Sequence, residues 1–298
     1  MLRQYKIHTN LDGTGDKVWD VTNGKVRIYQ PSNLGLQSTN NIWQSNGIGV
    51  MGTRSITQPQ IEFKLETFGE SLSENYQLMK DFVNDILSKK FVTLEYQTET
   101  FQVYADLALA DVTKTEGYGK NGTFSEKITF DIITKWYTYE NLTFEKIQNG
   151  KVIDGKSKIY GGIAPGNYKY IKGISYTYYG ETNIDRLSRW DIKDEIFSFM
   201  GILYPKLPKT PTGVRFLDDN GNEYTAIVFK TEQVQDYILI NTDVNDEIYQ
   251  GWNGTTSLNL FPVMDFERYR TRIIEHGQME LINLTKAEFK IKRKADFI

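Results

Sequence analysis

Polar and apolar residues alternate along much of the first half of the chain. Residues 60–68 place three apolar side chains on one face and three charged side chains on the other. The same period of two recurs over residues 101–109 and 128–132. Because successive side chains of a strand point to opposite faces, we expect these segments to be half-buried strands that cover one core from one side.

One segment between these strands changes to a helical period. Ser71 is followed three residues later by Glu74, the spacing of a capping box, in which each side chain bonds an otherwise unpaired backbone N–H. Apolar residues then recur at intervals of three and four, which predicts a helix from about Leu72 to Lys89. The expected apolar stripe consists of Leu72, Tyr76, Met79, Phe82, Val83, Ile86 and Leu87.

The stretch from Pro31 to Ser55 breaks the strand pattern. It is rich in Gly, Asn and Ser but too apolar for a plain linker, and an extended hairpin that packs on something is the better interpretation. Its apolar positions are Ile42, Trp43, Ile48, Val50 and Met51.

The composition shifts after Tyr139. Asn149 and Gly150 tolerate the positive backbone angles of a two-residue hairpin turn. Short strands are expected afterwards, so the second half is predicted to be an all-β sandwich. They are Ile174–Tyr179, Val214–Leu217, Tyr224–Phe229, Tyr237–Ile240 and the alternation that ends with Ala287, Phe289 and Ile291.

The segment from Ile159 to Leu207 does not fit this sandwich simply. It contains several glycines and a tyrosine-rich run, and between residues 183 and 200 the helical and strand periods fit equally well. An insertion that projects from the sandwich explains both features. The crowded tyrosines, too many for one sandwich face to bury, are Tyr168, Tyr170, Tyr176, Tyr178 and Tyr179.

Composition removes several classes of function. The 298 residues include no cysteine and two histidines, which excludes thiol chemistry and a multi-histidine metal site within one chain. A net charge of -3 gives no general attraction to nucleic acid or anionic lipid. The first residues lack the apolar core of a signal peptide and no stretch is long enough to span a membrane, so we expect synthesis in the cytoplasm.

Few residues are candidates for catalysis or metal binding. The run from Asp218 to Glu223 clusters oxygen ligands beside a glycine, as calcium loops do, but an Asn-Gly turn between two strands is the favoured interpretation. His8 and His276 have no visible partner motif and are expected to be structural. Carboxylate pairs such as Glu62 and Glu66 occur by chance at this composition.

Two stretches resemble one known family. In the first, a strand with Leu94 and Tyr96 is followed by Tyr104-Ala105-Asp106, Lys114-Thr115-Glu116, and Phe124 to Phe130 leading into Lys135-Trp136-Tyr137. It is similar to the end of the N-terminal domain of the distal tail proteins of long-tailed phages that infect Gram-positive bacteria. The second, residues 237–243 with Phe261-Pro262 and the last strand, resembles the galectin-like C-terminal domain of the same proteins, most of all the lactococcal variety.

This resemblance implies a mainly β protein and a structural hub at the tail tip. Residues 1–139 would form an N-terminal β-sandwich with one helix and an extended hairpin, and six such domains would close a ring between the tail tube and the tip protein. DNA would pass through the channel without specific binding. Residues 140–298 would form a galectin-like sandwich whose inserted arm, about residues 158–208, holds receptor-binding proteins for host adsorption.

The resemblance also suggests where contacts lie. The ring interface would be the apolar hairpin, at Ile42, Trp43, Ile48, Val50 and Met51. The arm would attach receptor-binding proteins through Tyr168, Tyr170, Tyr176, Tyr178 and Tyr204. No catalytic residue, metal, cofactor or membrane contact is expected, and the protein would be located in the virion after synthesis in the host cytoplasm.

Two other functions stay open. A carbohydrate-binding module could touch the host cell-wall polysaccharide through its aromatic residues, and a cell-wall hydrolase could use a pair of carboxylates. Trp252-Asn253-Gly254 resembles the tryptophan on which galectins stack galactose. The other galectin sugar-binding elements are absent from the sequence, so binding in the galectin manner is not expected.

Overall fold

The structure is a computed structural model that divides into two compact units. Unit 1 comprises residues 1–138 and 295–298, and unit 2 comprises residues 139–294. The chain therefore passes from unit 1 to unit 2 after residue 138 and returns after residue 294. The structure describes residues 3–35, 37–57, 60–114, 125–144, 147–148, 151–152, 186–206, 208, 210–231, 234 and 236–295.

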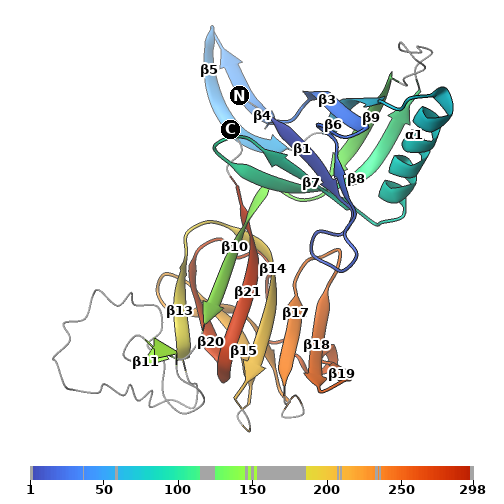
Figure 1. Cartoon of the computed structure of the whole chain (residues 1–298). Coiled ribbons are helices and arrows are strands. Elements are labelled where there is room, and N and C mark those ends of the chain that lie inside the picture. The colour runs from blue at the N-terminus through green and yellow to red at the C-terminus, as the bar shows by residue number, and fades with distance from the viewer. Residues whose placement is uncertain are drawn as a thin grey trace. The chain divides into compact units, whose positions relative to one another are not determined.

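Unit 1 is built on one antiparallel sheet that bends at its longest strand (Figure 1). The order across the sheet is β2-β1-β7-β8-β9-β6-β3, and β8 pairs with β7 through its first half and with β9 through its second. The strands are β1 (Gln4–His8), β2 (Val18–Asp20), β3 (Val26–Ser32), β6 (Ile61–Thr67), β7 (Val92–Gln97), β8 (Gln102–Thr113) and β9 (Ser125–Ile132).

The two halves of this bent sheet share one core. Ile7 and Leu94 come from one half, and Phe63 and Phe130 from the other, and all four are completely buried. The ring of Tyr5 on β1 meets that of Phe63 on β6 edge to face, with centroids 5.6 Å apart. The halves therefore act as the two layers of a sandwich, as the family resemblance implies.

Helix α1 (Leu72–Leu87) begins where the sequence predicts and ends two residues before Lys89. The Ser71 hydroxyl accepts a hydrogen bond from the Glu74 N–H at 3.2 Å. The Glu74 carboxylate reaches one residue further back than in a capping box and accepts from the Glu70 N–H at 2.7 Å. Both side chains thus satisfy backbone donors at the start of the helix.

The predicted apolar stripe of α1 is only partly buried. Phe82 and Ile86 lie in the core, but Leu72, Tyr76 and Leu87 are more than half exposed. The stripe is wider than the surface that the sheet of unit 1 covers, so one edge of it faces away from the core.

Unit 2 is a β-sandwich, as predicted. One sheet has the order β19-β18-β17-β14-β21-β10 and the other β13-β20-β15-β16. The first contains β10 (Tyr137–Phe144), whose first two residues belong to unit 1, with β14 (Ile196–Pro205), β17 (Tyr237–Asn241), β18 (Ile248–Asn253), β19 (Thr256–Asn259) and β21 (Leu284–Lys294). The second contains β13 (Arg186–Ile192), β15 (Thr212–Leu217), β16 (Glu223–Phe229) and β20 (Gly277–Ile282).

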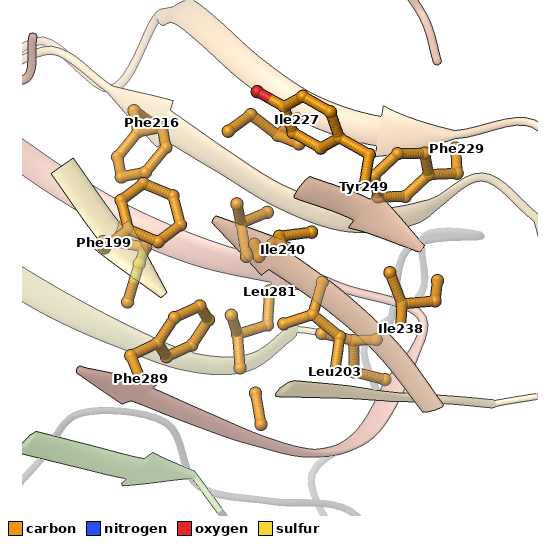
Figure 2. Close-up of a cluster of buried hydrophobic side chains, with 14 of the residues drawn as sticks. Phe199, Leu203, Phe216, Ile227, Phe229, Ile238, Ile240, Tyr249, Leu281 and Phe289 are labelled. Atoms are coloured by element: carbon orange, nitrogen blue, oxygen red, sulfur yellow. The ribbon is translucent and has the colours of Figure 1, made fainter. Parts of the chain in front are cut away.

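The core of unit 2 lies between these sheets (Figure 2). Phe199 and Phe289 from one sheet point toward Phe216 and Leu281 from the other, and the rings of Phe199 and Phe216 are 5.9 Å apart. A 3-10 helix, η2 (Phe261–Val263), follows β19. Two short strands, β11 (Ile147–Gln148) and β12 (Lys151–Val152), pair as the predicted hairpin turn requires.

The segment with ambiguous period folds as strands. Within residues 183–200, the described part contains β13 and the first half of β14. Phe199, Gly201 and Leu203 are buried, whereas Met200 and Ile202 between them are less so, and this period of two is that of a strand. The expected strand Ile174–Tyr179 lies outside the described residues.

Across the described ranges, no helix is both long and apolar enough to cross a membrane.

Candidate functional site

The extended hairpin is a separate two-stranded ribbon. Strands β4 (Gln37–Ser45) and β5 (Ile48–Thr57) pair only with each other and form their own sheet, drawn in Figure 1 as a long curved ribbon. Asn46 and Gly47 join them with φ angles of +50° and +79°. These are the positive angles of a tight hairpin turn, which asparagine and glycine adopt most readily.

The ribbon exposes the apolar residues that the sequence singled out. Trp43 is 69% exposed and Ile48 71%, and Val50, Ile42 and Met51 are exposed as well. An isolated pair of strands has no core of its own and is marginally stable in water. A contiguous apolar surface on a soluble protein marks a contact site.

The register divides these residues between the two faces of the ribbon. Trp43 lies opposite Val50, and Ile48 is two residues before Val50, so the three share one face. Ile42 lies opposite Met51 on the other face. Both faces of the ribbon therefore present apolar side chains, and a neighbour is needed to bury them.

Of the predicted attachment tyrosines, the structure describes one. Tyr168, Tyr170, Tyr176 and Tyr178 lie outside the described residues. Tyr204 lies within β14, where it is half-buried and its ring is 6.4 Å from that of Tyr237. Lys286, its cross-strand neighbour on β21, places its ammonium 5.5 Å from the Tyr204 ring.

The position of Tyr204 narrows the segment that can project from unit 2. Residues 186–192 and 196–205 form β13 and β14 of the sandwich, so they belong to its two sheets. The part of the expected arm of residues 158–208 that begins at residue 186, nearly half of it, therefore contributes two strands to the sandwich. The rest of that range, up to residue 185, lies outside the described residues.

His8 is held in a network of charged groups. Its Nδ1 lies 2.7 Å from an Asp16 carboxylate oxygen and its Nε2 2.9 Å from a Glu95 carboxylate oxygen. Lys6 bonds the other Glu95 oxygen at 2.9 Å. Burial acts to raise the pKa of both carboxyl groups, but hydrogen bonds from His8, and from Lys6 in the case of Glu95, hold each pKa below its usual value.

This network has a structural explanation. His8 ends β1, Glu95 lies on the paired strand β7, and Asp16 belongs to the loop that follows β1. Both ring nitrogens of His8 face carboxylates. A histidine that acts as a general base needs one ring nitrogen available to a serine or a water molecule. Sequence reasoning missed the Glu95 partner because it is 87 residues away along the chain.

The clustered oxygens of residues 218–223 form a turn. The Asp218 carboxylate accepts hydrogen bonds from the backbone N–H groups of Asn220 and Asn222, at 2.9 and 2.8 Å. These bonds, that from Asn222 foremost, lower the pKa of Asp218. Gly221 has a φ of +82°, so this segment is the hairpin turn between β15 and β16. His276 and Asp219 beside it are both exposed, 3.3 Å apart.

The described residues hold no group of three or more His, Asp or Glu side chains that could bind a metal. Trp252, the residue that resembles the galectin tryptophan, is half-buried on β18. Its ring stacks on that of Tyr237, with centroids 6.0 Å apart and planes 18° from parallel. A protein side chain therefore already covers one face of this ring.

The chain matches two family models that together cover nearly all of it. One, described as the N-terminal domain of the distal tail protein, matches residues 4–133. The other, described as the C-terminal domain of Dit, matches residues 135–298. The break between the two matches falls within a few residues of the boundary between unit 1 and unit 2.

Similar proteins are found in lactococcal phages. The distal tail protein of Lactococcus phage p2 is 93% identical over 298 residues, and that of Lactococcus phage SK1 is 91% identical, each with both sequences covered completely. A chain in the structure of the phage p2 baseplate in its activated conformation with Ca is similar in fold. It matches with a TM-score of 0.80 and 93% identity over all of both chains.

Proposed function

The chain belongs to the distal tail protein family, and from this membership we propose that it is a structural subunit of a phage baseplate. It is a virion protein at the tip of the tail. It acts by assembly: six copies close a ring between the tail tube protein and the tip protein, and the ring leaves a channel through which DNA passes without specific binding.

The observation that carries this proposal is the exposed apolar ribbon of β4 and β5. Both of its faces carry large apolar side chains that unit 1 leaves in water. A ring needs an interface in which one surface of each copy meets a different surface of the next. A ribbon that reaches away from its own core is suited to be one of those surfaces, as a strap held by the neighbouring copy.

We further propose that unit 2 holds the receptor-binding proteins that adsorb the phage to its host. The family resemblance supports this, and the attachment residues proposed are Tyr168, Tyr170, Tyr176 and Tyr178. Tyr204 is left out of this set, because it is engaged within β14.

No catalytic step is part of the proposed function. The titratable groups that could suggest one have structural partners: His8 is held between Asp16 and Glu95, and Asp218 caps its own turn. The pure protein is expected to release neither reducing sugar nor peptide from Gram-positive cell walls.

Deletion of residues 41–53 tests the ring. The full-length chain is expected to be hexameric by size-exclusion chromatography with light scattering, and the deletion variant to be a folded monomer. The deletion removes no residue of either core, so the variant should still unfold cooperatively, and its far-ultraviolet circular dichroism should stay close to that of the parent.

Two matched variants test whether the ring needs the apolar side chains of the ribbon or only its two strands. Changing Trp43, Ile48 and Val50 together to serine keeps both strands but removes one apolar face, and it should also prevent the ring. Changing Ser38, Thr39 and Gln44 to alanine should leave it intact. Hexamers that persist after the deletion would refute the proposal that the ribbon is a ring contact.

A further inference from the structure

Several asparagines in the chain are followed directly by glycine. Four such pairs lie within the described residues, and two more, at residues 121–122 and 149–150, lie outside them. Asparagine is one of the chemically labile residues of proteins. A following glycine favours its loss, because glycine has no Cβ to hinder attack by its backbone nitrogen on the asparagine side chain. The four described pairs are Asn23-Gly24, Asn46-Gly47, Asn220-Gly221 and Asn253-Gly254.

The structure separates these four pairs by the backbone N–H of the glycine. That group must lose its proton before the nitrogen can attack, so an N–H that donates a hydrogen bond reacts only when the bond opens. Three of the four glycines donate such a bond and are protected by it. They are Gly24, which donates to the Asp20 carbonyl, Gly221, which donates to the Asp218 carbonyl, and Gly254, which donates to an Asp236 carboxylate oxygen.

Gly47 is the exception. Its N–H has no hydrogen-bond partner among the residues that the structure describes. Asn46 and Gly47 are both exposed, and a Cβ added at Gly47 would meet no described atom within 4 Å apart from its chain neighbours. The single charged residue of the ribbon, Arg54, lies away from this turn, where it bonds the Asn40 side chain at 2.9 Å. A ribbon of two strands has no core that would resist opening of its turn.

We propose that Asn46 is a modification site, at which the chain deamidates spontaneously through a cyclic imide formed with Gly47. Both residues of the pair are in water, and the attacking nitrogen has no bond to break first. The proposal concerns the chemistry of the turn alone, so it stands or falls independently of the function proposed above.

The reaction consumes water and needs no other reagent. Hydroxide removes the proton of the Gly47 N–H, and the nitrogen attacks Cγ of Asn46. The Cγ–Nδ2 bond breaks, and Nδ2 takes a proton from water and leaves as ammonia, which regenerates the hydroxide. Water then opens the imide. Addition at Cγ gives aspartate, and addition at the Asn46 backbone carbonyl gives isoaspartate, in which the main chain runs through the former side chain.

Both products change the tip of the ribbon. Each replaces a neutral amide with a carboxylate and so adds one negative charge. Isoaspartate also adds a carbon atom to the main chain, and the two-residue turn that pairs Ser45 with Ile48 no longer fits. A chain built into a virion is not replaced, so every conversion persists and converted copies accumulate with age.

The test follows the folded full-length protein during incubation at mildly alkaline pH. Trypsin releases residues 28–54 as one peptide, and fragmentation in the mass spectrometer assigns the converted asparagine. A sample digested without incubation corrects for conversion during digestion, and a methyltransferase specific for isoaspartate identifies that product.

Asn46 is expected to convert about fivefold faster or more than Asn23, Asn220 and Asn253, the factor that one hydrogen bond of ordinary net strength imposes. A rate at Asn46 no higher than at these three would overturn the proposal. Conversion to aspartate without isoaspartate would overturn the cyclic imide.

Two further measurements test whether hydrogen bonding is the cause. In guanidinium chloride all four glycine N–H groups are released, so the four rates should draw together. Asp236→Ala removes the exposed acceptor of the Gly254 N–H and should speed conversion of Asn253 in the folded protein about fivefold. The same spread of rates with and without denaturant, or no acceleration in Asp236→Ala, would show that hydrogen bonding does not select the site.

Asn46→Gly is the matched control at the turn itself. Glycine adopts the positive φ of this position, and a Gly-Gly pair suits the same two-residue hairpin turn. The peptide of residues 28–54 should then keep its mass throughout the incubation, while Asn23, Asn220 and Asn253 convert as in the parent. Conversion of this peptide at the parent rate would overturn the assignment to Asn46.

Discussion

At the scale of single residues, unit 2 contains an ion pair in which both side chains are buried. The Lys292 ammonium on β21 lies 2.9 Å from an Asp243 carboxylate oxygen, and both side chains are less than a tenth exposed. The other Asp243 oxygen accepts a hydrogen bond from the Asn245 N–H at 3.0 Å. Removing one partner of such a pair leaves the other charge buried and uncompensated.

Asp243→Ala is therefore expected to lower the free energy of unfolding of unit 2 by about 3–5 kcal/mol. Urea denaturation followed by fluorescence measures the change. Lys292→Met added to Asp243→Ala should restore part of the loss, because it removes the buried charge that Asp243 balanced. Lys230→Ala is the control: its ammonium bonds Asp265 at 3.0 Å but is exposed, so it should cost at most about 1 kcal/mol. Equal losses from Asp243→Ala and Lys230→Ala would contradict this account.

At the scale of elements, the His8 network ties β1, the loop after it and β7 together. Hydrogen bonding holds the pKa of Asp16 and of Glu95 below the values of these groups in an unfolded chain, despite burial. Both carboxylates therefore stabilise unit 1 above the ordinary carboxyl range of about pH 4. The unfolded chain binds more protons as the pH falls through this range, and the stabilisation is lost.

The expected result is a fall in the free energy of unfolding of unit 1 between about pH 5 and pH 3 that is shallower in His8→Leu. Without the imidazole, the folded-state pKa values of Asp16 and Glu95 move up toward those of the unfolded chain. Denaturant titrations across this range measure the slope. His276→Leu should keep the parent slope, because His276 is exposed. Identical slopes for His8→Leu and the parent would rule out the network as the cause.

The elements also show how far the sequence pattern reaches. Alternation located β6 within two residues, and the Ser71–Glu74 spacing located the start of α1. The pattern could not separate the part of the apolar stripe that the sheet buries, at Phe82 and Ile86, from the part left exposed at Tyr76. Helical period reports which side chains are apolar, but what covers them is decided by tertiary packing.

Contacts between residues far apart in the sequence could not be predicted from its local pattern. The apolar ribbon was foreseen because its residues had no local core, and the structure leaves them exposed. By contrast, the pairing of His8 with Glu95 depends on strand order, which no local pattern contains. Strand β14, which contains Tyr204, could not be predicted for the same reason. The hydrophobic period at its start fits a helix equally well, and only its pairing with β17 and β21 shows that it is a strand.

At the scale of the whole molecule, the chain has two separate cores. One is built from α1 and from the strands of unit 1 other than β4 and β5, and the other from the sandwich of residues 139–294. The last described residue, Ala295, returns to unit 1, where its N–H donates to the Trp136 carbonyl at 2.8 Å. Each unit thus has its own core to lose on heating, and two calorimetric transitions are expected.

Ring formation should act on only one of these transitions. The ribbon belongs to unit 1, so self-association through it stabilises the folded form of unit 1 by mass action. The transition of unit 1 is therefore expected to move to higher temperature as the protein concentration rises, and that of unit 2 to stay in place. Scanning calorimetry over a hundredfold range of concentration measures both.

Two variants assign the transitions and complete the test. Asp243→Ala lowers the transition of unit 2 and so identifies it, since its ion pair lies wholly within the sandwich. Deletion of residues 41–53 removes the ribbon and should make the transition of unit 1 independent of concentration. If both transitions instead move together in the parent chain, and still do so after the deletion, association involves unit 2 and the ribbon is not the contact that closes the ring.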